Sequence, residues 1–246
     1  MSTKAYYPIS EIGKGKVGFS KTRSIIEGAF YGNNVVKVNT LREAYELAKN
    51  SPGTIVTDMP VYRGEEFGLD KDAKVLLFND GAITGRYATA RRIAGEPGVD
   101  CEALDKVAMD AIYESRWKTM YHAEVFVGLD PEFMVKAHLL IPEGEENIMY
   151  NWMLNFQYMS DEYVKMYKKS KPVGDGKEPD IYIFSDPQWC GSDRPSVSLD
   201  CLSDPQKKTL CYFNTDTNCA CILGMRYFGE HKKGTLTMAW AIANRN

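Results

Sequence analysis

Strand-like and helix-like apolar segments alternate along the chain, but they do not follow a regular strand–helix–strand rhythm. Such a mixture predicts an α/β domain with a mixed sheet, because a purely parallel sheet requires a helix between successive strands. The strand-like segments lie at 35–38, 54–59, 74–78, 121–127, 135–141, 180–184, 196–201 and 209–213, and the helix-like ones at 41–49, 101–116, 146–159 and 234–243.

Local signals set several boundaries of these elements. Glu43 follows Thr40 by three residues, the spacing of a helix capping box. The composition of 128–132 is typical of a turn between two strands, and the Lys-, Gly- and Pro-rich stretch 168–179 predicts an exposed loop. Segments 54–59 and 74–78 predict buried strands. Segment 234–243 has almost no polar face, which predicts a buried helix.

Composition excludes several classes of protein. The 246 residues are 44% hydrophobic with a net charge of −3, which argues against disorder and against a strongly basic nucleic-acid binder. No apolar run approaches the ~18 residues that a membrane helix needs. Six scattered cysteines are typical of reduced thiols in a cytosolic protein. We therefore expect a cytoplasmic globular protein that binds neither nucleic acid nor membrane.

Several motif matches are too weak to indicate a site. Residues 13–18 fit G-x-G-x-x-G, but Pro8 makes the preceding segment a poor strand for a dinucleotide fold. Cys219 and Cys221 lack a second pair of zinc ligands, so we expect buried reduced thiols in a strand. His122 and His138 each stand alone in strand-like segments and are interpreted as structural histidines. The sequence contains no phosphate-binding loop of the G-x-x-x-x-G-K-[ST] type.

Two clusters of basic residues are more informative. In the first, a glycine-bracketed turn at 79–86 presents Arg86, and Arg91 and Arg92 follow; an arginine fork pairs with a carboxylate or phosphate, although a solvated basic loop fits the same residues. The second cluster spans 226–234 and places Lys232 and Lys233 at the expected mouth of the C-terminal helix. The helix dipole and mutual repulsion there favour a neutral ligand or an anion clamp, with an ordinary surface pair as the alternative.

The second cluster carries a resemblance to a known family. Tyr227-Phe228-Gly229-Glu230-His231-Lys232-Lys233-Gly234 resembles the Y-x-G-E-x-K-K-G motif of phosphoenolpyruvate carboxykinase, more the ATP-dependent type than the GTP-dependent one. Thr84-Gly85-Arg86 resembles the start of its T-G-R-S-P-K-D-K substrate loop. Residues 125–132 resemble its Y-V-G-A-D-P-E turn, and 151–159 falls where the family has a Trp- and Phe-rich helix. The similarity spans roughly residues 75 to 240.

The resemblance implies a function and roles for four residues. The family converts oxaloacetate and ATP to phosphoenolpyruvate, carbon dioxide and ADP. Arg86 would bind the substrate carboxylate, and Tyr227 would lie against the substrate or carbon dioxide. Lys232 would contact the transferring phosphoryl group or the substrate, and Lys233 would ligate Mn²⁺. We expect both lysines to act in catalysis, because decarboxylation and phosphoryl transfer build up negative charge that cations stabilise.

The sequence also departs from the family pattern. After Arg86 it continues Tyr87-Ala88-Thr89-Ala90-Arg91 in place of S-P-K-D-K. The family continues into a nucleotide-binding domain that holds Mg²⁺-ATP and the remaining manganese ligands, and the 246 residues contain no such domain. We therefore expect residues 1–246 to form a single N-terminal substrate-binding domain, inactive without a nucleotide-binding domain in cis or in trans. The alternative is a stand-alone module that binds a small carboxylate or a partner protein and has lost catalysis.

Overall fold

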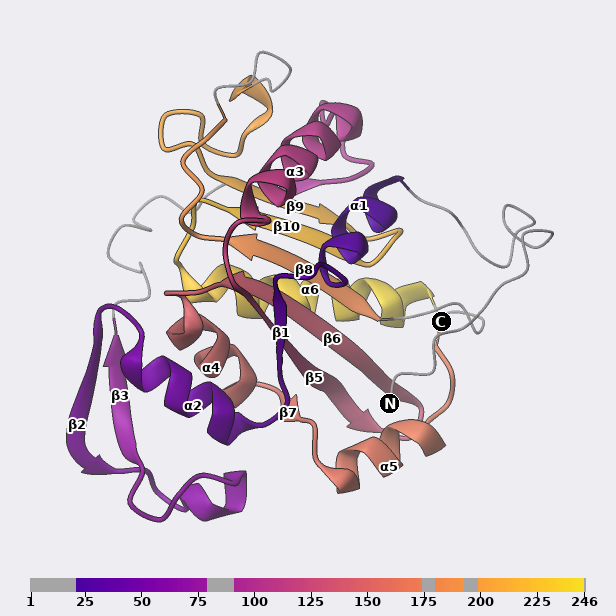
Figure 1. Ribbon diagram of the computed structural model, residues 1–246. Helices are drawn as coiled ribbons and strands as arrows, with labels where there is room; N and C mark the ends of the chain where they lie inside the picture. Colours follow the sequence, from indigo (N-terminus) through magenta and orange to yellow (C-terminus); the bar gives the residue numbers. More distant parts are fainter. Residues whose placement is uncertain (1–20, 79–90, 174–179, 193–198, 246) are drawn as a thin grey trace.

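A mixed sheet runs through the middle of the molecule (Figure 1). The computed structural model describes residues 21–78, 91–173, 180–192 and 199–245. The sheet has eight strands in the order β1-β5-β6-β8-β10-β9-β4, with β7 paired to β5. These strands are β1 (Val35–Val38), β4 (Arg92–Ile93), β5 (Met120–Asp130), β6 (Phe133–Pro142), β7 (Gln157–Tyr158), β8 (Ile181–Asp186), β9 (Leu210–Asn214) and β10 (Cys219–Leu223).

The sheet contains both parallel and antiparallel strand pairs. The β5–β6 and β9–β10 pairs are antiparallel hairpins, whereas β6, β8 and β10 run parallel to one another. At the two edges, β1 is parallel to β5 and β4 is parallel to β9. The predicted α/β class with a mixed sheet is therefore confirmed.

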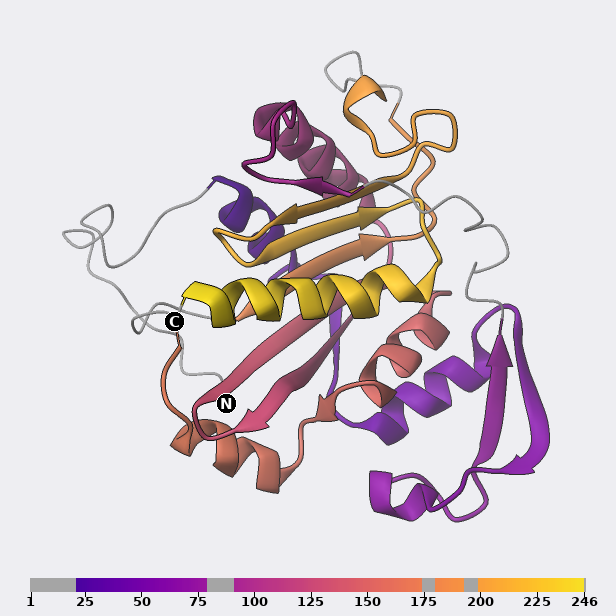
Figure 2. The same ribbon diagram turned by 180° about the vertical axis from the view of Figure 1, so that it is seen from behind.

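Helices cover both faces of the sheet. Helices α1 (Lys21–Ala29) and α3 (Cys101–Ser115) pack on one face. Helices α2 (Leu41–Asn50), α4 (Glu146–Leu154) and α6 (Phe228–Arg245) pack on the other, where α6 lies along the strands (Figure 2). Helix α5 (Asp161–Lys169) contacts β5 through the Phe126–Tyr167 ring pair. No helix among the described residues is both long and apolar enough to cross a membrane.

Strand alternation divides the apolar side chains into two cores. On β6, Leu139 and Ile141 face the core beneath α2, α4 and α6, whereas Leu140 faces α1 and α3. Across the first core, the Trp152 indole donates a hydrogen bond of 3.0 Å to Thr235 Oγ1, which joins α4 to α6. The position of α6 on the sheet is thus fixed by packing and by a buried polar contact.

The helix after Thr40 forms as predicted. Thr40 accepts a hydrogen bond from the backbone of Glu43, and the Glu43 side chain returns one to the cap. The strands predicted at 54–59 and 74–78 also exist, as β2 (Thr54–Pro60) and β3 (Lys74–Phe78), but they form a separate antiparallel pair. The prediction that both strands are buried is wrong, since Ile55 on β2 is 64% exposed and Leu77 on β3 is 55% exposed.

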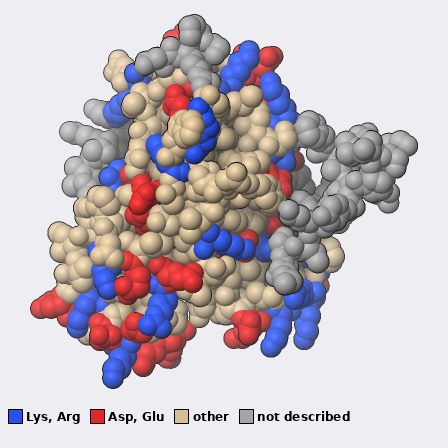
Figure 3. All heavy atoms as spheres, in the orientation of Figure 1, with Lys and Arg blue, Asp and Glu red and all other residues tan. Residues whose placement is uncertain are grey.

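Acidic and basic side chains mingle around this small sheet and α2, at the lower left of Figure 3. Three exposed ion pairs account for part of that pattern. They are Arg42–Asp70, Lys49–Glu46 and Arg63–Glu66. The surface around β2, β3 and α2 therefore carries charges of both signs.

Other boundaries differ from the predictions. The predicted helix 146–159 ends at Leu154 and gives way to β7. Helix α5 was not predicted, and only its last two residues fall within the predicted exposed loop 168–179. The strand predicted at 196–201 is wrong in its described part, where η4 (Leu199–Cys201) is a 3₁₀ helix; a second such helix, η2, spans Gly64–Phe67.

The C-terminal helix differs from its prediction in two ways. It begins at Phe228 rather than Gly234, so Lys232 and Lys233 lie in its second turn and not at its mouth. It is also not fully buried, because Trp240 is 64% exposed.

Candidate functional site

Buried contacts anchor the start of α6. His231 is fully buried, and its Nε2 shares a hydrogen bond of 2.8 Å with Ser185 Oγ on β8. Its Nδ1 lies 3.3 Å from the Tyr227 carbonyl oxygen. Burial lowers the pKa of His231 to about 4, and the Tyr227 carbonyl only partly opposes that effect. The imidazole is therefore a neutral anchor that fixes the first turns of α6 against the sheet.

Gly234 allows α6 to approach β9 closely. A Cβ atom at this position would lie 2.5 Å and 2.7 Å from two ring carbons of Phe213. Phe213 is itself fully buried and has no space to move into. The glycine in the motif is therefore explained by close helix–sheet packing.

Lys232 and Lys233 point in different directions, because successive helical residues are about 100° apart. Lys232 lines an open hollow of about 240 Å³ together with Phe126, Gly128 and Asn155. Lys233 is exposed and shares a helix face with Glu230 and Thr237, which are three and four residues away. Tyr227, just before the helix, is 38% exposed.

Two other segments of the family resemblance line the same hollow as Lys232. Residues 126–129 belong to the 125–132 turn, and residues 155–157 belong to the 151–159 segment. Gly128 has φ +80°, and a Cβ there would meet the Phe133 carbonyl oxygen at 2.7 Å. A glycine is thus required near the end of β5, where the register with β6 becomes irregular.

Arg91 connects the first basic cluster to α6. Its Nε donates a hydrogen bond of 2.9 Å to Glu230 Oε2, and its NH1 donates one of 2.9 Å to Thr237 Oγ1. The guanidinium also lies over the Phe213 ring, 5.1 Å from its centroid. Arg86, five residues earlier, lies outside the described residues, as does the G-x-G-x-x-G match at 13–18.

The remaining arginines of the two clusters make structural contacts. Arg92 donates hydrogen bonds to the carbonyl oxygens of Cys201 and Leu202. Arg226 forms an ion pair of 3.2 Å with the buried Glu145. Both side chains hold neighbouring loops in place.

The cysteines of β10 are buried reduced thiols, as predicted. Cys219 and Cys221 are fully buried and free. Burial raises the pKa of Cys219 to about 12, although Arg23 nearby opposes that shift. These thiols are therefore protonated packing residues of the α1 and α3 core.

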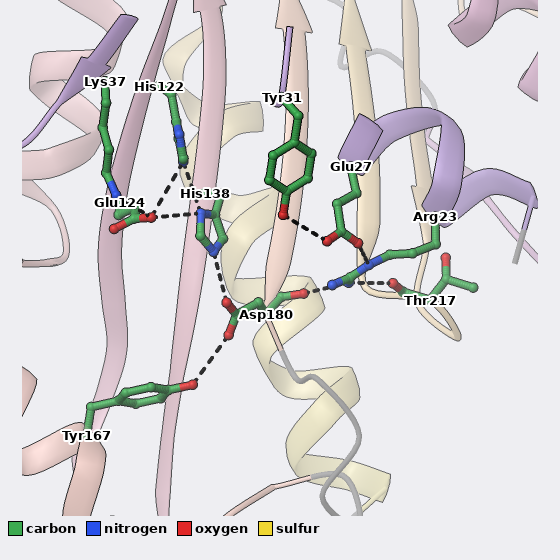
Figure 4. Close-up of polar contacts among 10 residues, drawn as sticks. All are labelled: Arg23, Glu27, Tyr31, Lys37, His122, Glu124, His138, Tyr167, Asp180 and Thr217. Atoms are coloured by element: carbon green, nitrogen blue, oxygen red, sulfur yellow. Dashed lines mark hydrogen bonds and ion pairs between the residues drawn. The ribbon is translucent and has the colours of Figure 1, made fainter. Parts of the chain in front are cut away.

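A second polar site, on the opposite face of the sheet from α6, was not predicted. His122 and Glu124 lie on β5, and His138 lies on β6 directly across from Glu124 (Figure 4). His122 Nε2 and His138 Nδ1 are 3.0 Å apart. Glu124 Oε1 lies 3.4 Å from His138 Nδ1 and 3.8 Å from His122 Nε2. Within the described residues, these three form the one group of His, Cys, Asp and Glu side chains with the proximity of metal ligands.

Neighbouring residues orient this triad. His138 Nε2 shares a hydrogen bond of 2.9 Å with Asp180 Oδ2, and the Tyr167 hydroxyl donates one of 3.3 Å to Asp180 Oδ1. The Tyr182 ring stacks on His138 with centroids 4.3 Å apart. Lys37 forms an ion pair of 3.0 Å with Glu124. The His138 ring and the Glu124 carboxylate are thereby fixed in orientation.

Burial and neighbouring charges set the protonation of the triad. Desolvation and the neighbouring His138 lower the pKa of His122 to about 3. Desolvation would raise the pKa of Glu124, but His138 and the Lys37 ammonium outweigh it and lower that pKa. His122 is therefore neutral and Glu124 ionised at neutral pH.

The sequence contains one signal for this site. His122 and Glu124 are two residues apart in a predicted strand, so their side chains lie on the same face. The contribution of His138 depends on the register of the β5–β6 hairpin, which pairs Glu124 with His138. The sequence alone does not give this register, so each histidine was interpreted as an isolated structural residue.

No family model fits the sequence, and no curated protein shows significant similarity to it.

Proposed function

We propose that this chain is the substrate-binding domain of a phosphoenolpyruvate carboxykinase-like enzyme, which converts oxaloacetate and ATP to phosphoenolpyruvate, carbon dioxide and ADP. The observation that carries the proposal is the gathering of separate motif segments around the start of α6. Lys232 lines a hollow with residues of the 125–132 and 151–159 segments. Arg91, just after the Thr84-Gly85-Arg86 motif, is bonded to Glu230.

The proposed chemistry explains why cations are presented there. Decarboxylation breaks a carbon–carbon bond of oxaloacetate, and the electron pair remains on the enolate of pyruvate. The enolate oxygen then attacks the γ-phosphorus of ATP while the bond to ADP breaks. Negative charge develops in both steps. The ammonium group of Lys232 would stabilise it by electrostatic preorganisation, and Lys233, as a neutral amine, would help to hold the metal ion that does the same. Tyr227 would lie against the substrate, and Arg86 would pair with its carboxylate.

The manganese ion of this proposal needs ligands from elsewhere. Lys233 would be one ligand. Glu230, which lies on the same helix face as Lys233, is not available as a second one because it is hydrogen-bonded to Arg91. No cluster of His, Cys, Asp or Glu with ligand geometry surrounds Lys233 among the residues that the structure describes. The described residues alone thus do not form the manganese site, and a nucleotide-binding domain in cis or in trans would supply the remaining ligands together with Mg²⁺-ATP.

The alternative function is a stand-alone small-carboxylate or partner-binding module. The departure from S-P-K-D-K after Arg86 favours it, because Arg91 of that segment is used internally. The two readings differ in one property, which is turnover of oxaloacetate when a nucleotide-binding domain is present.

Calorimetric titration of the chain with phosphoenolpyruvate and with oxalate, a mimic of the enolate, tests the proposed site. We expect both anions to bind, and Lys232→Ala to weaken binding about tenfold or more, the cost of one charge-assisted contact. Lys106→Ala, on the far face in α3, is the matched control and should leave binding unchanged. Absence of binding, or equal effects of the two substitutions, would contradict the proposal.

A further inference from the structure

We infer that His122, Glu124 and His138 form a binding site for a divalent transition-metal ion of the zinc class. The site lies on the opposite face of the sheet from α6 and is independent of the proposed substrate site. The inference rests on the geometry of three donor atoms and of the groups that hold them.

The donor atoms have the spacing that such an ion requires. Two imidazole nitrogens and one carboxylate oxygen make a set that zinc uses in catalytic sites, where a water takes the fourth position. Bonds of about 2.0–2.1 Å in a tetrahedron place neighbouring donors about 3.3 Å apart. The three observed separations are 3.0, 3.4 and 3.8 Å. Small side-chain adjustments are therefore sufficient to admit an ion.

The groups behind the donors resemble the support of a metal site. A ligating histidine usually directs its second nitrogen at a carboxylate, which fixes the ring and raises its basicity. His138 does this through Asp180, which in turn accepts the Tyr167 hydroxyl (Figure 4). The Phe30 ring meets His122 edge-on, with centroids 5.0 Å apart. The donors are held by packing as well as by hydrogen bonds.

Lys37 supplies a positive charge that neutralises Glu124 when no metal ion is bound. Its ammonium lies 3.0 Å from the same oxygen, Oε1, that faces both histidines. The Lys37 side chain is 44% exposed and can turn to solvent. We infer that the ion displaces this ammonium, and that the lysine lowers the metal affinity of the site by competing for Glu124.

Nuclear magnetic resonance of the histidine ring nitrogens tests the site directly. The chain has only three histidines, and the third, His231, lies on α6 and is buried between this helix and the sheet. Titration of the full chain with Zn²⁺ should shift the ring signals of His122 and His138 and leave His231 as an internal reference. Unchanged signals at saturating Zn²⁺, or equal shifts of all three, would overturn the inference.

Variants separate metal binding from a merely structural network. Glu124→Gln should abolish the Zn²⁺-induced shifts, and Asp180→Asn should weaken Zn²⁺ binding roughly 10–100-fold. Lys37→Met removes the competing ammonium and should tighten binding, which also keeps the inference testable if Glu124→Gln fails to fold. Weaker binding in Lys37→Met, or wild-type binding in a folded Glu124→Gln protein, would contradict the site.

Discussion

Arg91 and Glu230, which are 139 residues apart in the sequence, meet through a hydrogen bond of 2.9 Å at the start of α6. Their side chains are 25% and 12% exposed, so the ion pair is partly shielded from solvent. It attaches the segment that follows Arg86 to the helix that carries Lys232 and Lys233. The proposed substrate site thus depends on a contact that involves neither Arg86 nor the two lysines.

Replacing Arg91 with alanine should destabilise this arrangement. Glu230 would lose its partner while remaining largely buried, at a cost of about 1–3 kcal/mol in the free energy of unfolding. Arg91→Lys keeps the charge but loses the fork that also reaches Thr237, so it should fall between wild type and Arg91→Ala. Chemical denaturation measures both. An Arg91→Ala protein as stable as wild type would show that the pair contributes nothing.

Gly234→Ala should destabilise the protein although alanine favours helix. The added methyl group would collide with the buried Phe213 ring, and overpacking of this kind costs about 1–3 kcal/mol, against a propensity gain of at most ~1 kcal/mol. The matched control is Gly28→Ala in α1, where a Cβ meets nothing within 4 Å. Thermal unfolding should show a lower Tm for Gly234→Ala only. Equal Tm values for both variants would contradict the packing role of Gly234.

His231 should make stability depend on pH. Its pKa is lowered to about 4 in the folded protein, below the value of about 6.5 in an unfolded chain. The folded state therefore binds fewer protons, and the free energy of unfolding falls by about 3 kcal/mol as pH decreases from 6.5 to 4. Above pH 6.5 this contribution is fully present.

Denaturation of His231→Gln across this pH range provides the check. The glutamine cannot titrate, so the variant should lose stability less steeply below pH 6.5 than wild type does. His122, which also has a lowered pKa, remains in the variant and retains part of the slope. Identical slopes for the two proteins would be inconsistent with a neutral buried His231.

Under the proposed function, Arg86 and Lys233 should affect different kinetic constants when this chain acts together with a nucleotide-binding domain. Arg86 would contact a carboxylate present in both ground state and transition state, so Arg86→Ala should mainly raise KM, about tenfold or more. Lys233 would interact most strongly with charge that develops during reaction, so its loss should lower kcat. A fall in kcat without a rise in KM for Arg86→Ala would contradict its binding role.

The parts of the fold that local patterns determine were predictable. The capping box of Thr40 and Glu43 defines α2, and the helical stripe at 101–116 corresponds to α3. The exposure of β2 was not predictable, because Ile55 and Val56 form an apolar run whose burial depends on which elements pack against it. The start of α6 was missed because Lys232 and Lys233 interrupt its apolar pattern, although His231 on the same turn is buried.

The candidate sites also divide into residues that a local pattern identifies and residues that only the fold brings together. Lys232, Lys233 and Tyr227 were identified because they lie together in one short motif. The roles of Arg91 and of the His122–Glu124–His138 triad depend on contacts between distant segments or strands, which require the three-dimensional fold. Sequence spacing alone could suggest only the His122–Glu124 pair.

The most direct test of the proposed function is the formation of phosphoenolpyruvate from oxaloacetate and ATP by this chain combined with a nucleotide-binding domain, in cis or in trans, measured for wild type and Lys233→Ala. We expect ATP-dependent turnover by the wild type, a fall in kcat of roughly 10²-fold or more in the variant, and no turnover by residues 1–246 alone. Turnover by the isolated chain, or a Lys233→Ala enzyme within a few-fold of the wild-type kcat, would contradict it.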